Sequence, residues 1–137
     1  MVVELKGRPI VEGLTRGKAL VSQKPLSFLG GVDPRGVIIE KDHDLQGQSM
    51  KNVILCFPHG HGSTVSSYVL YSLAKKGVGP KAIVNVTADP VVVVGAVIAN
   101  VPMIDHIDIS QIKTDDIVEV DGEAGIVKIL EAEETCT

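Results

Sequence analysis

Short runs of apolar residues, separated by glycine and polar turn residues, predict a chain built mainly of short strands. The run at 53–57 is apolar throughout, which is typical of a strand buried on both faces of a sheet. Asp121 and Gly122 predict the turn of a closing hairpin. The predicted strands cover residues 2–5, 9–14, 17–22, 37–40, 53–57, 82–86, 103–106, 117–120 and 125–130.

The segment that follows this buried run predicts an amphipathic helix. Apolar residues recur every four positions from Val65 to Leu73 and would share one helical face. Ser63 and Thr64 stand where an N-cap belongs, because their side chains can accept hydrogen bonds from the first main-chain N–H groups. A pair of lysines followed by Gly77 is typical of a helix end.

The segment between Asp89 and Asn100 carries signals for two kinds of element. Its run of valines favours a strand, because β-branched side chains pack well there. Asp89 followed by Pro90 favours a helix start, and Asn100 near a proline favours a helix end. Because the two ends agree, we expect a helix.

The order of these elements predicts the α/β class, with mixed sheets and two main helices. Several strands precede a β-α-β-α-β unit and a closing hairpin, so the helices would pack on a largely β body. We expect a single domain over residues 1–137, with residues 131–137 as a frayed polar tail. With no Trp, two Phe and two Tyr, the core must be aliphatic.

Composition narrows the range of functions. The net charge is −4 and the basic residues are scattered, so neither nucleic acid nor a membrane surface is an expected partner. No signal peptide and no membrane-spanning segment is evident, which predicts a cytoplasmic protein. Cys56 and Cys136 lack neighbours at metal-ligand spacing, and an iron–sulfur cluster takes three or four thiolates. We therefore expect no metal site in this chain.

The candidate chemistry lies in CFPHGHGST, residues 56–64, where a buried strand ends and a helix begins. Gly60 and Gly62 allow positive φ and the close approach of a ligand. The free N–H groups of a helix start form an anion site and would stabilise an oxyanion on Ser63. Ser63 is equally well explained as a helix cap. The segment lacks the lysine of a Walker loop and the second glycine of a nucleophile elbow.

Three segments of the chain resemble the small subunit of the aconitase X family. These segments read GRPIVEGLTRGKALVS, GHGSTVSSYVLYSLAKKG and ADPVVVVGAVIANVP, and the resemblance covers nearly the whole chain. It implies a swivelling β/β/α domain like that of aconitase. It also implies a hydro-lyase that dehydrates (R)-5-phosphomevalonate to trans-anhydromevalonate 5-phosphate in the archaeal mevalonate pathway.

The resemblance further implies a partner and a set of roles. The partner is a large subunit that carries a four-iron four-sulfur cluster and forms a heterodimer with this chain, which is inactive alone. The family's proton acceptor is the serine of the Gly-Ser-Thr motif, which is Ser63 here. The substrate is a small phosphorylated hydroxy acid. On the helix-start argument, Gly62 and Thr64 would donate main-chain N–H groups to it.

Two other functions use the same segment. Swivelling domains also serve as phosphohistidine carriers, and His59 or His61 could accept the phosphoryl group. The order His-Gly-Ser counts against this alternative, because such carriers place the histidine at the helix start. The other alternative is an anion-binding module without catalysis. For the two histidines themselves, hydrogen bonding within the loop is the expected role.

Overall fold

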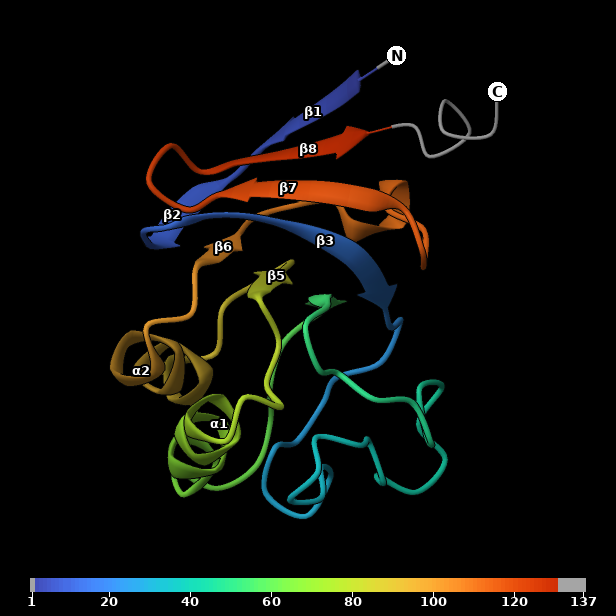
Figure 1. Ribbon diagram of the computed structural model, residues 1–137, viewed down its shortest axis with the longest axis vertical. Coiled ribbons are helices and arrows are strands. Elements are labelled where there is room, and N and C mark those ends of the chain that lie inside the picture. Colours follow the sequence, from blue (N-terminus) through green and yellow to red (C-terminus); the bar gives the residue numbers. More distant parts are fainter. Residues whose placement is uncertain (1, 131–137) are drawn as a thin grey trace.

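The computed structural model describes residues 2–130 and contains one eight-stranded sheet with the order β1-β8-β7-β3-β4-β5-β6-β2 (Figure 1). Two α-helices lie on one face of this sheet, which confirms the predicted α/β class with two main helices. The elements are β1 Val2–Lys6, β2 Arg8–Val11, β3 Leu14–Val21, β4 Ile54–Phe57, α1 Ser66–Lys75, β5 Ala82–Asn85, α2 Pro90–Ala99, β6 Met103–Asp105, the 3-10 helix Ile109–Gln111, β7 Ile117–Asp121 and β8 Ile126–Leu130.

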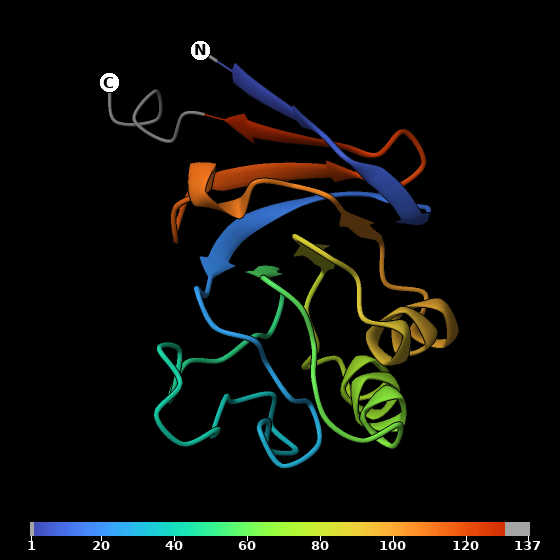
Figure 2. The same cartoon turned by 180° about the vertical axis from the view of Figure 1, so that it is seen from behind.

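The long strand β3 joins two halves of the sheet. Its first part, from Leu14 to Lys18, pairs with β7 in the antiparallel half, together with β8 and β1. Its last part, from Ala19 to Val21, pairs with β4 in the parallel half. There β3, β4, β5 and β6 all run in the same direction, and β2 closes the far edge. Both views show α1 and α2 side by side against the parallel half (Figures 1 and 2).

The parallel strands are buried on both faces, as predicted for 53–57. Leu55, Phe57 and Ile83 face the helices and the segment between β3 and β4. Ile54 and Val84 face the antiparallel half. The expected aliphatic core is confirmed apart from one aromatic pair, in which Phe28 meets Phe57 edge to face with centroids 6.2 Å apart.

The strand predicted at 37–40 is wrong. Val37 and Ile38 make only isolated bridges, to Ser49 and Val32, inside the long irregular segment that joins β3 to β4. This segment contributes to the core through buried Ile38, Leu45 and Met50. Its apolar residues are therefore buried without a strand partner, a distinction that the local pattern cannot make. The strands predicted at 9–14 and 17–22 also have other bounds in the structure. Strand β2 ends at Val11 and β3 begins at Leu14, with Gly13 at φ 140° between them.

The two helices test the capping predictions with opposite results. Helix α2 is confirmed: Asp89 is its N-cap, Pro90 its first residue and Asn100 its left-handed C-cap. Helix α1 starts later than predicted, at Ser66, and its N-cap residue Val65 has no side-chain capping bond. The prediction that Ser63 or Thr64 caps it is wrong.

The buried face of α1 also differs from the predicted one. Of the predicted positions only Leu73 is fully buried, since Val69 is half-buried and Val65 is 47% exposed. The other buried positions are Leu70 and the small residues Ser66 and Ser67. The small side chains let α2 approach closely, since a Cβ on Gly95 would lie 3.2 Å from Ser67 Cα. At the other end, Gly77 follows the C-cap residue with φ 76°. No helix within residues 2–130 is long and apolar enough to cross a membrane.

Candidate active site

Because β3, β4, β5 and β6 are parallel, their carboxyl ends meet at one edge of the sheet, which is where open α/β sheets bind ligands. The segments that leave this edge start at Ser22, Pro58, Val86 and His106. The segment from Pro58 to Val65, here called the serine loop, connects β4 to α1 and contains the predicted site residues. The parallel half of the sheet thus places them where binding chemistry is expected.

The serine loop is fixed by the segment that follows β3. Leu26 N–H donates to the carbonyl of His59, and His61 N–H donates to the carbonyl of Leu26, both at 3.2 Å. Gly62 has φ 106°, which confirms the expected positive φ there, and a Cβ on it would lie 2.8 Å from Ser27 Oγ. The position therefore favours glycine for both its conformation and its surroundings.

Gly60 serves a different purpose from the predicted one. Its φ is not positive, and a Cβ there would collide with Cγ2 of Val92 in α2. The missing side chain brings the loop against a helix of the same chain and not against a ligand. Together the two glycines let the serine loop pack closely against Val92 of α2 and against Ser27.

Ser63 lies exposed at the end of this loop, just before α1. Its Oγ accepts a hydrogen bond from Val65 N–H at 3.2 Å. Among the residues that the structure describes, the N–H groups of Gly62, Ser63 and Thr64 donate to no atom. A serine oxygen with one N–H donor in place, and others free beside it, has the surroundings that stabilise negative charge on oxygen.

The neighbouring helix start is occupied by its own side chain. Asp89 Oδ2 accepts from Val91 N–H at 3.1 Å and from Val92 N–H at 3.3 Å. Pro90 has no N–H to satisfy. The first turn of α2 is therefore closed to ligands, whereas the turn before α1 is open.

Asp105, at the end of β6, holds the segment that leads into α2. Its carboxylate is fully buried and accepts two bonds from Arg8, at 2.9 and 2.7 Å, and one from Ala88 N–H at 2.8 Å. Burial alone would raise the pKa of Asp105, but these hydrogen bonds and the Arg8 charge outweigh it, so the pKa lies below its ordinary value. The carboxylate thus stays charged and positions the residue before Asp89.

A second polar group ties β4 to β5 at the origin of the serine loop. Asn85 is fully buried at the end of β5, and its Nδ2 donates to the carbonyl of Phe57 at 2.9 Å. Its Oδ1 has no hydrogen-bond partner among the described residues. The bond fixes the last residue of β4, from which the chain turns into Pro58 and the loop.

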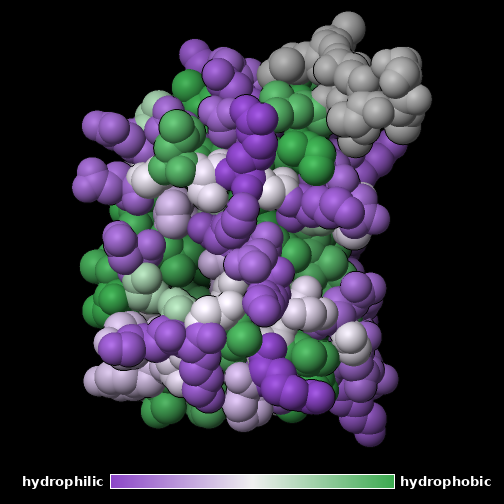
Figure 3. Space-filling model, in the orientation of Figure 1, coloured by the Kyte–Doolittle hydropathy of each residue, from purple (hydrophilic) through white to green (hydrophobic). Residues whose placement is uncertain are grey.

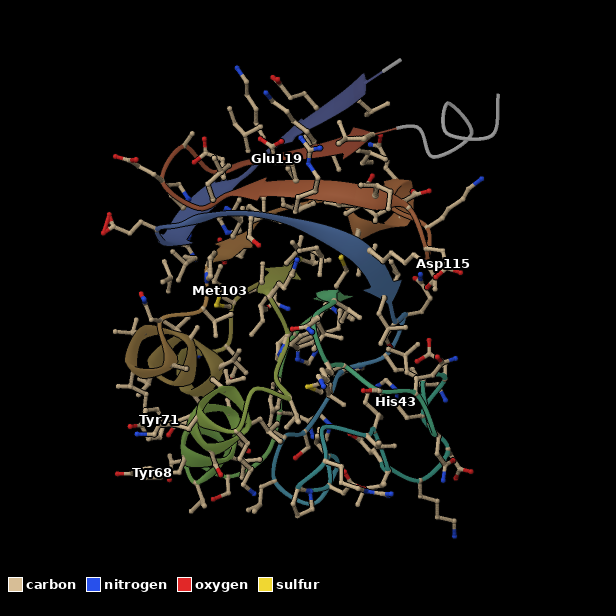
Figure 4. The ribbon with its side chains drawn as sticks, in the orientation of Figure 1. His43, Tyr68, Tyr71, Met103, Asp115 and Glu119 are labelled. Atoms are coloured by element: carbon tan, nitrogen blue, oxygen red, sulfur yellow. The ribbon has the colours of Figure 1, made fainter. Side chains whose placement is uncertain are left out.

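His43 anchors the irregular segment next to the serine loop (Figure 4). The ring is buried, Nδ1 lies 3.1 Å from the N–H of Leu45, and Nε2 lies 3.1 Å from the carbonyl of Pro25. Asp44 Oδ1 also lies 3.1 Å from Nδ1, so the ring joins the chain at Pro25 to Asp44 and Leu45. Nearby, Ser22 Oγ donates to Asp44 at 2.6 Å, so the end of β3 is joined to the same segment.

A hollow of about 350 Å³ lies beside the serine loop, and His59 and His61 line one side of it. His59 Nδ1 bonds the carbonyl of Gly60 at 2.8 Å, which confirms the expected hydrogen bond within the loop. His61 Nε2 instead lies 3.2 Å from Glu40 in another segment. The remaining charged side chains around the hollow are of both signs: Lys24, Lys41, Glu40 and Asp42. It is therefore not a strongly positive cradle.

Comparison with known proteins identifies the fold and its family. The family model described as the aconitase X swivel domain matches residues 4–129. The chain belongs to the aconitase X swivel-domain family. The swivelling fold predicted from the sequence is therefore confirmed. Its structure superimposes on the crystal structure of Thermococcus kodakaraensis aconitase X in the holo form with a TM-score of 0.92 and 50% identity, covering 94% of this chain and 99% of that chain.

Curated relatives of the swivel domain agree with this assignment. The phosphomevalonate dehydratase small subunit of Methanocaldococcus jannaschii is 56% identical, over 93% of this chain and 98% of the relative. The protein of the same name from Pyrococcus furiosus is 54% identical, over 93% of this chain and 96% of the relative. Nearly the full length of each relative is matched, so the resemblance is not confined to one motif.

The swivel domain does not offer ligands for an iron–sulfur cluster within its described residues. No group of three or more His, Cys, Asp or Glu side chains there is arranged to hold a metal ion. Cys56 is buried, and burial raises the pKa of its thiol to about 12, so it is no thiolate ligand. It is the core residue that its place in the apolar run predicted. Cys136 lies outside the described residues.

Sequence reasoning missed three residues that hold the site in place. Asn85 and Asp105 are the polar residues near the ends of two apolar runs, and that position was the available signal. A polar residue that ends a buried strand is retained when it bonds the segments leaving the sheet. His43 stands in a polar stretch and gave no such signal, because its burial depends on segments far away in the chain.

Proposed function

We propose that this swivel domain is the small subunit of a two-chain phosphomevalonate dehydratase. With its large subunit it would convert (R)-5-phosphomevalonate to trans-anhydromevalonate 5-phosphate, in a reaction of the hydro-lyase class. The names of the relatives support this activity. The structural observation that carries the proposal is an exposed serine just before a helix start without a side-chain cap, with one N–H donor at its oxygen and, beside it, N–H groups that are free within the described chain.

Ser63 is the proposed proton acceptor. In the dehydration a C–H bond next to the substrate carboxylate breaks and its proton passes to Ser63 Oγ. The electron pair forms the new carbon–carbon double bond as the C–O bond on the neighbouring carbon breaks, and the hydroxyl leaves as water once it is protonated. A free serine is a weak base at neutral pH, because its hydroxyl is hard to ionise. The Val65 N–H and the start of α1 favour the ionised oxygen.

Gly62 and Thr64 are the proposed substrate-binding residues through their main-chain N–H groups. Those groups are free within the described chain, and they flank Ser63. An anionic group of the substrate bound there would lie within reach of the serine oxygen. The hollow beside the loop has mixed charge, so recognition of the phosphate would be shared with the large subunit.

The four-iron four-sulfur cluster belongs, in this proposal, to the large subunit. The described residues of the swivel domain offer no set of ligands for it, and Cys56 is a buried thiol. The name small subunit, carried by the relatives, supports a second chain. The division of labour follows: this chain brings the base, and the partner brings the cluster.

The test is a reconstituted enzyme. The chain is co-expressed with its candidate cluster-bearing partner, the cluster is rebuilt without oxygen, and the dehydration of 5-phosphomevalonate is measured for wild type and Ser63→Ala. We expect activity for the pair and a loss of about 10²-fold or more in kcat for the variant, the size of a lost general base.

Thr64→Ala is the matched control, because it removes a neighbouring exposed hydroxyl while keeping the main-chain N–H. Its activity should stay within a few-fold of wild type. A Ser63→Ala pair that assembles and works like wild type would contradict the role of the serine. An assembled wild-type pair that does not dehydrate this substrate would contradict the substrate. Transfer of label from phosphoenolpyruvate to His59 or His61 would favour the carrier function instead.

A further inference from the structure

Helix α2 is apolar on every side. Its ten residues, PVVVVGAVIA, contain no charged or polar side chain. Val92, Gly95 and Ala96 are buried against the rest of the domain, but Val94, Val97 and Ile98 are exposed by 51%, 56% and 45%. A helix that is hydrophobic all round normally has all its sides covered. The outer side of α2 therefore lacks a cover within residues 2–130.

Helix α1 extends this apolar surface. Tyr68 and Tyr71 are exposed by 68% and 37%, and they point outward on the same side of the molecule as α2 (Figure 4). The space-filling view shows apolar residues over α2 on that side (Figure 3). We call the surface made by Tyr68, Tyr71, Val94, Val97 and Ile98 the helix face. Tyrosine is among the residues enriched in protein interfaces.

The helix face continues directly into the serine loop. A hollow of about 260 Å³ lies between the starts of the two helices, lined by Thr64, Ser67, Pro90, Val91 and Val94. Thr64 follows Ser63 in the chain, so a molecule that rests on Val94 can also cover the serine loop. The hollow is large enough for a bulky apolar side chain.

We propose that the helix face is the docking surface for the large subunit, with an apolar side chain of that subunit seated in the hollow. The inference rests on the proposed function, which needs a second chain over Ser63. Because the helix face adjoins the serine loop, a partner bound there could place its own active-site groups beside Ser63. It would also cover the side of α2 that this chain leaves open.

A second copy of this chain fits the same surface less well. A two-fold dimer uses the same patch on both copies. Centred on the helix face, it would bring only a second, identical serine loop to Ser63, whereas the proposed reaction needs a different chain that carries the cluster there. The large subunit is therefore the occupant that agrees with the proposed function.

The test measures assembly and activity separately. The affinity of the isolated chain for the reconstituted large subunit is measured for wild type, Val94→Glu and Ile98→Glu. Each variant puts a charge on the helix face, so we expect Kd to rise by about 30-fold or more, as for loss of an interface hot spot. Val3→Glu is the control, because Val3 is 38% exposed on β1 at the far edge of the sheet. Its Kd should equal that of wild type.

Activity titrations separate docking from chemistry. With limiting large subunit, Val94→Glu should raise the concentration of chain that gives half-maximal dehydration. Ser63→Ala should lower the maximum without moving that concentration. Thermal unfolding of each isolated chain shows that the variants are folded. Ile98 does not line the hollow beside the serine loop. The docking surface is therefore supported only if Ile98→Glu raises Kd as well as Val94→Glu.

The outcomes distinguish the two proposals. If both charged variants bind like wild type, the docking surface is wrong, whatever the activity. If they weaken a complex that does not dehydrate phosphomevalonate, docking stands and the proposed reaction fails. If the isolated wild-type chain dimerises and Val94→Glu makes it monomeric, the occupant is a second copy, and the proposal is overturned.

Discussion

The starts of α1 and α2 form a natural comparison. Both helices follow parallel strands of the same sheet, and both begin after short loops at its carboxyl edge. At α2 the carboxylate of Asp89 accepts the first N–H groups. At α1 the N-cap residue is Val65, without a capping side chain, and the N–H groups of the preceding turn are free within the described chain.

The comparison shows that the first N–H groups of a helix can be bonded by a side chain of the same chain or stay free to bind a ligand. An N-cap side chain stabilises a helix by about 1 kcal/mol and closes its first turn. The α1 turn lacks that stabilisation, and its free donors are the proposed binding site for an external anion. Ser63 accepts one N–H group from Val65, two residues on, and its hydroxyl is still exposed. The difference predicts opposite effects for matched substitutions at the two starts.

The largest expected effect is on catalysis at the open start. Ser63→Ala should lower kcat of the reconstituted pair by about 10²-fold or more, while the free energy of unfolding of the chain changes by less than about 0.5 kcal/mol. The reason is that Ser63 is exposed and does not cap α1. Enzyme kinetics and urea unfolding on the same preparation measure both. A loss of stability equal to that of a cap would contradict the comparison.

The second effect concerns the support of the closed start. Arg8→Met leaves the buried carboxylate of Asp105 with the Ala88 N–H and with His106 Nε2 at 3.8 Å, and should lower the free energy of unfolding by more than the matched control does. Arg16→Met is the matched control: Arg16 also pairs with a carboxylate, that of Glu119, but this pair is exposed, so its loss should cost below about 1 kcal/mol. Equal losses would contradict the role of burial.

The Arg8 pair also predicts a dependence on pH. Because folding lowers the pKa of Asp105, its stabilisation is complete above the unfolded pKa of about 3.9 and is lost as pH falls through the folded value. The difference in unfolding free energy between wild type and Arg8→Met should therefore shrink below about pH 4. Urea unfolding between neutral and acid pH measures it. A constant difference would show that the pKa of Asp105 does not depend on Arg8.

The third effect tests the glycine that shapes the open start. Gly62→Ala should destabilise the chain by about 1–2 kcal/mol, because an L-residue is strained at its positive φ. The new Cβ would also press on Ser27 Oγ. Gly77, at the end of α1, also has a positive φ, 76°, but open space around it, so Gly77→Ala measures the cost of the backbone conformation without a steric clash. Gly62→Ala should lower kcat as well, and Gly77→Ala should not.

The smallest effect is expected at the closed start itself. Asp89→Ala should lower the free energy of unfolding by about 1 kcal/mol, the usual contribution of an N-cap. In the reconstituted pair kcat should stay near wild type. Asp89→Asn keeps a capping oxygen and should recover most of the stability. A large fall in kcat with no loss of stability would place Asp89 in the chemistry and remove the contrast between the two helix starts.

The sequence predicted α2 more accurately than α1 for a physical reason. Asp89, Pro90 and Asn100 act through bonds and dihedral angles within a few residues, so their effect can be read locally. Ser63 and Thr64 resemble caps by the same local rule, but the chain stays non-helical for longer there. Contacts of the serine loop with Leu26 and Ser27 hold it in another conformation.

An apolar run predicted a strand correctly only where the run pairs with other strands in a regular ladder. Residues 53–57 could be assigned to a buried strand, because a fully apolar run of that length has few other uses. Residues 37–40 have a similar composition, yet they end as isolated bridges in an irregular segment. Their main-chain partners lie in the irregular turns on either side, at Gly31, Asp33, Gly47 and Gln48, so no neighbouring strand forms a ladder with them.

By itself the sequence determined the α/β class, the glycine-rich link from a buried strand to a helix, and the family to which the chain belongs. These depend on short-range chemistry and on long matched segments. Tertiary structure alone decided that Ser63 is not a cap, that Asn85, Asp105 and His43 hold the surrounding segments, and that α1 and α2 share an apolar outer face. The physical reason is that hydrogen-bond partners and burial are set by residues distant in the chain, and they exist only once the sheet has brought those residues together.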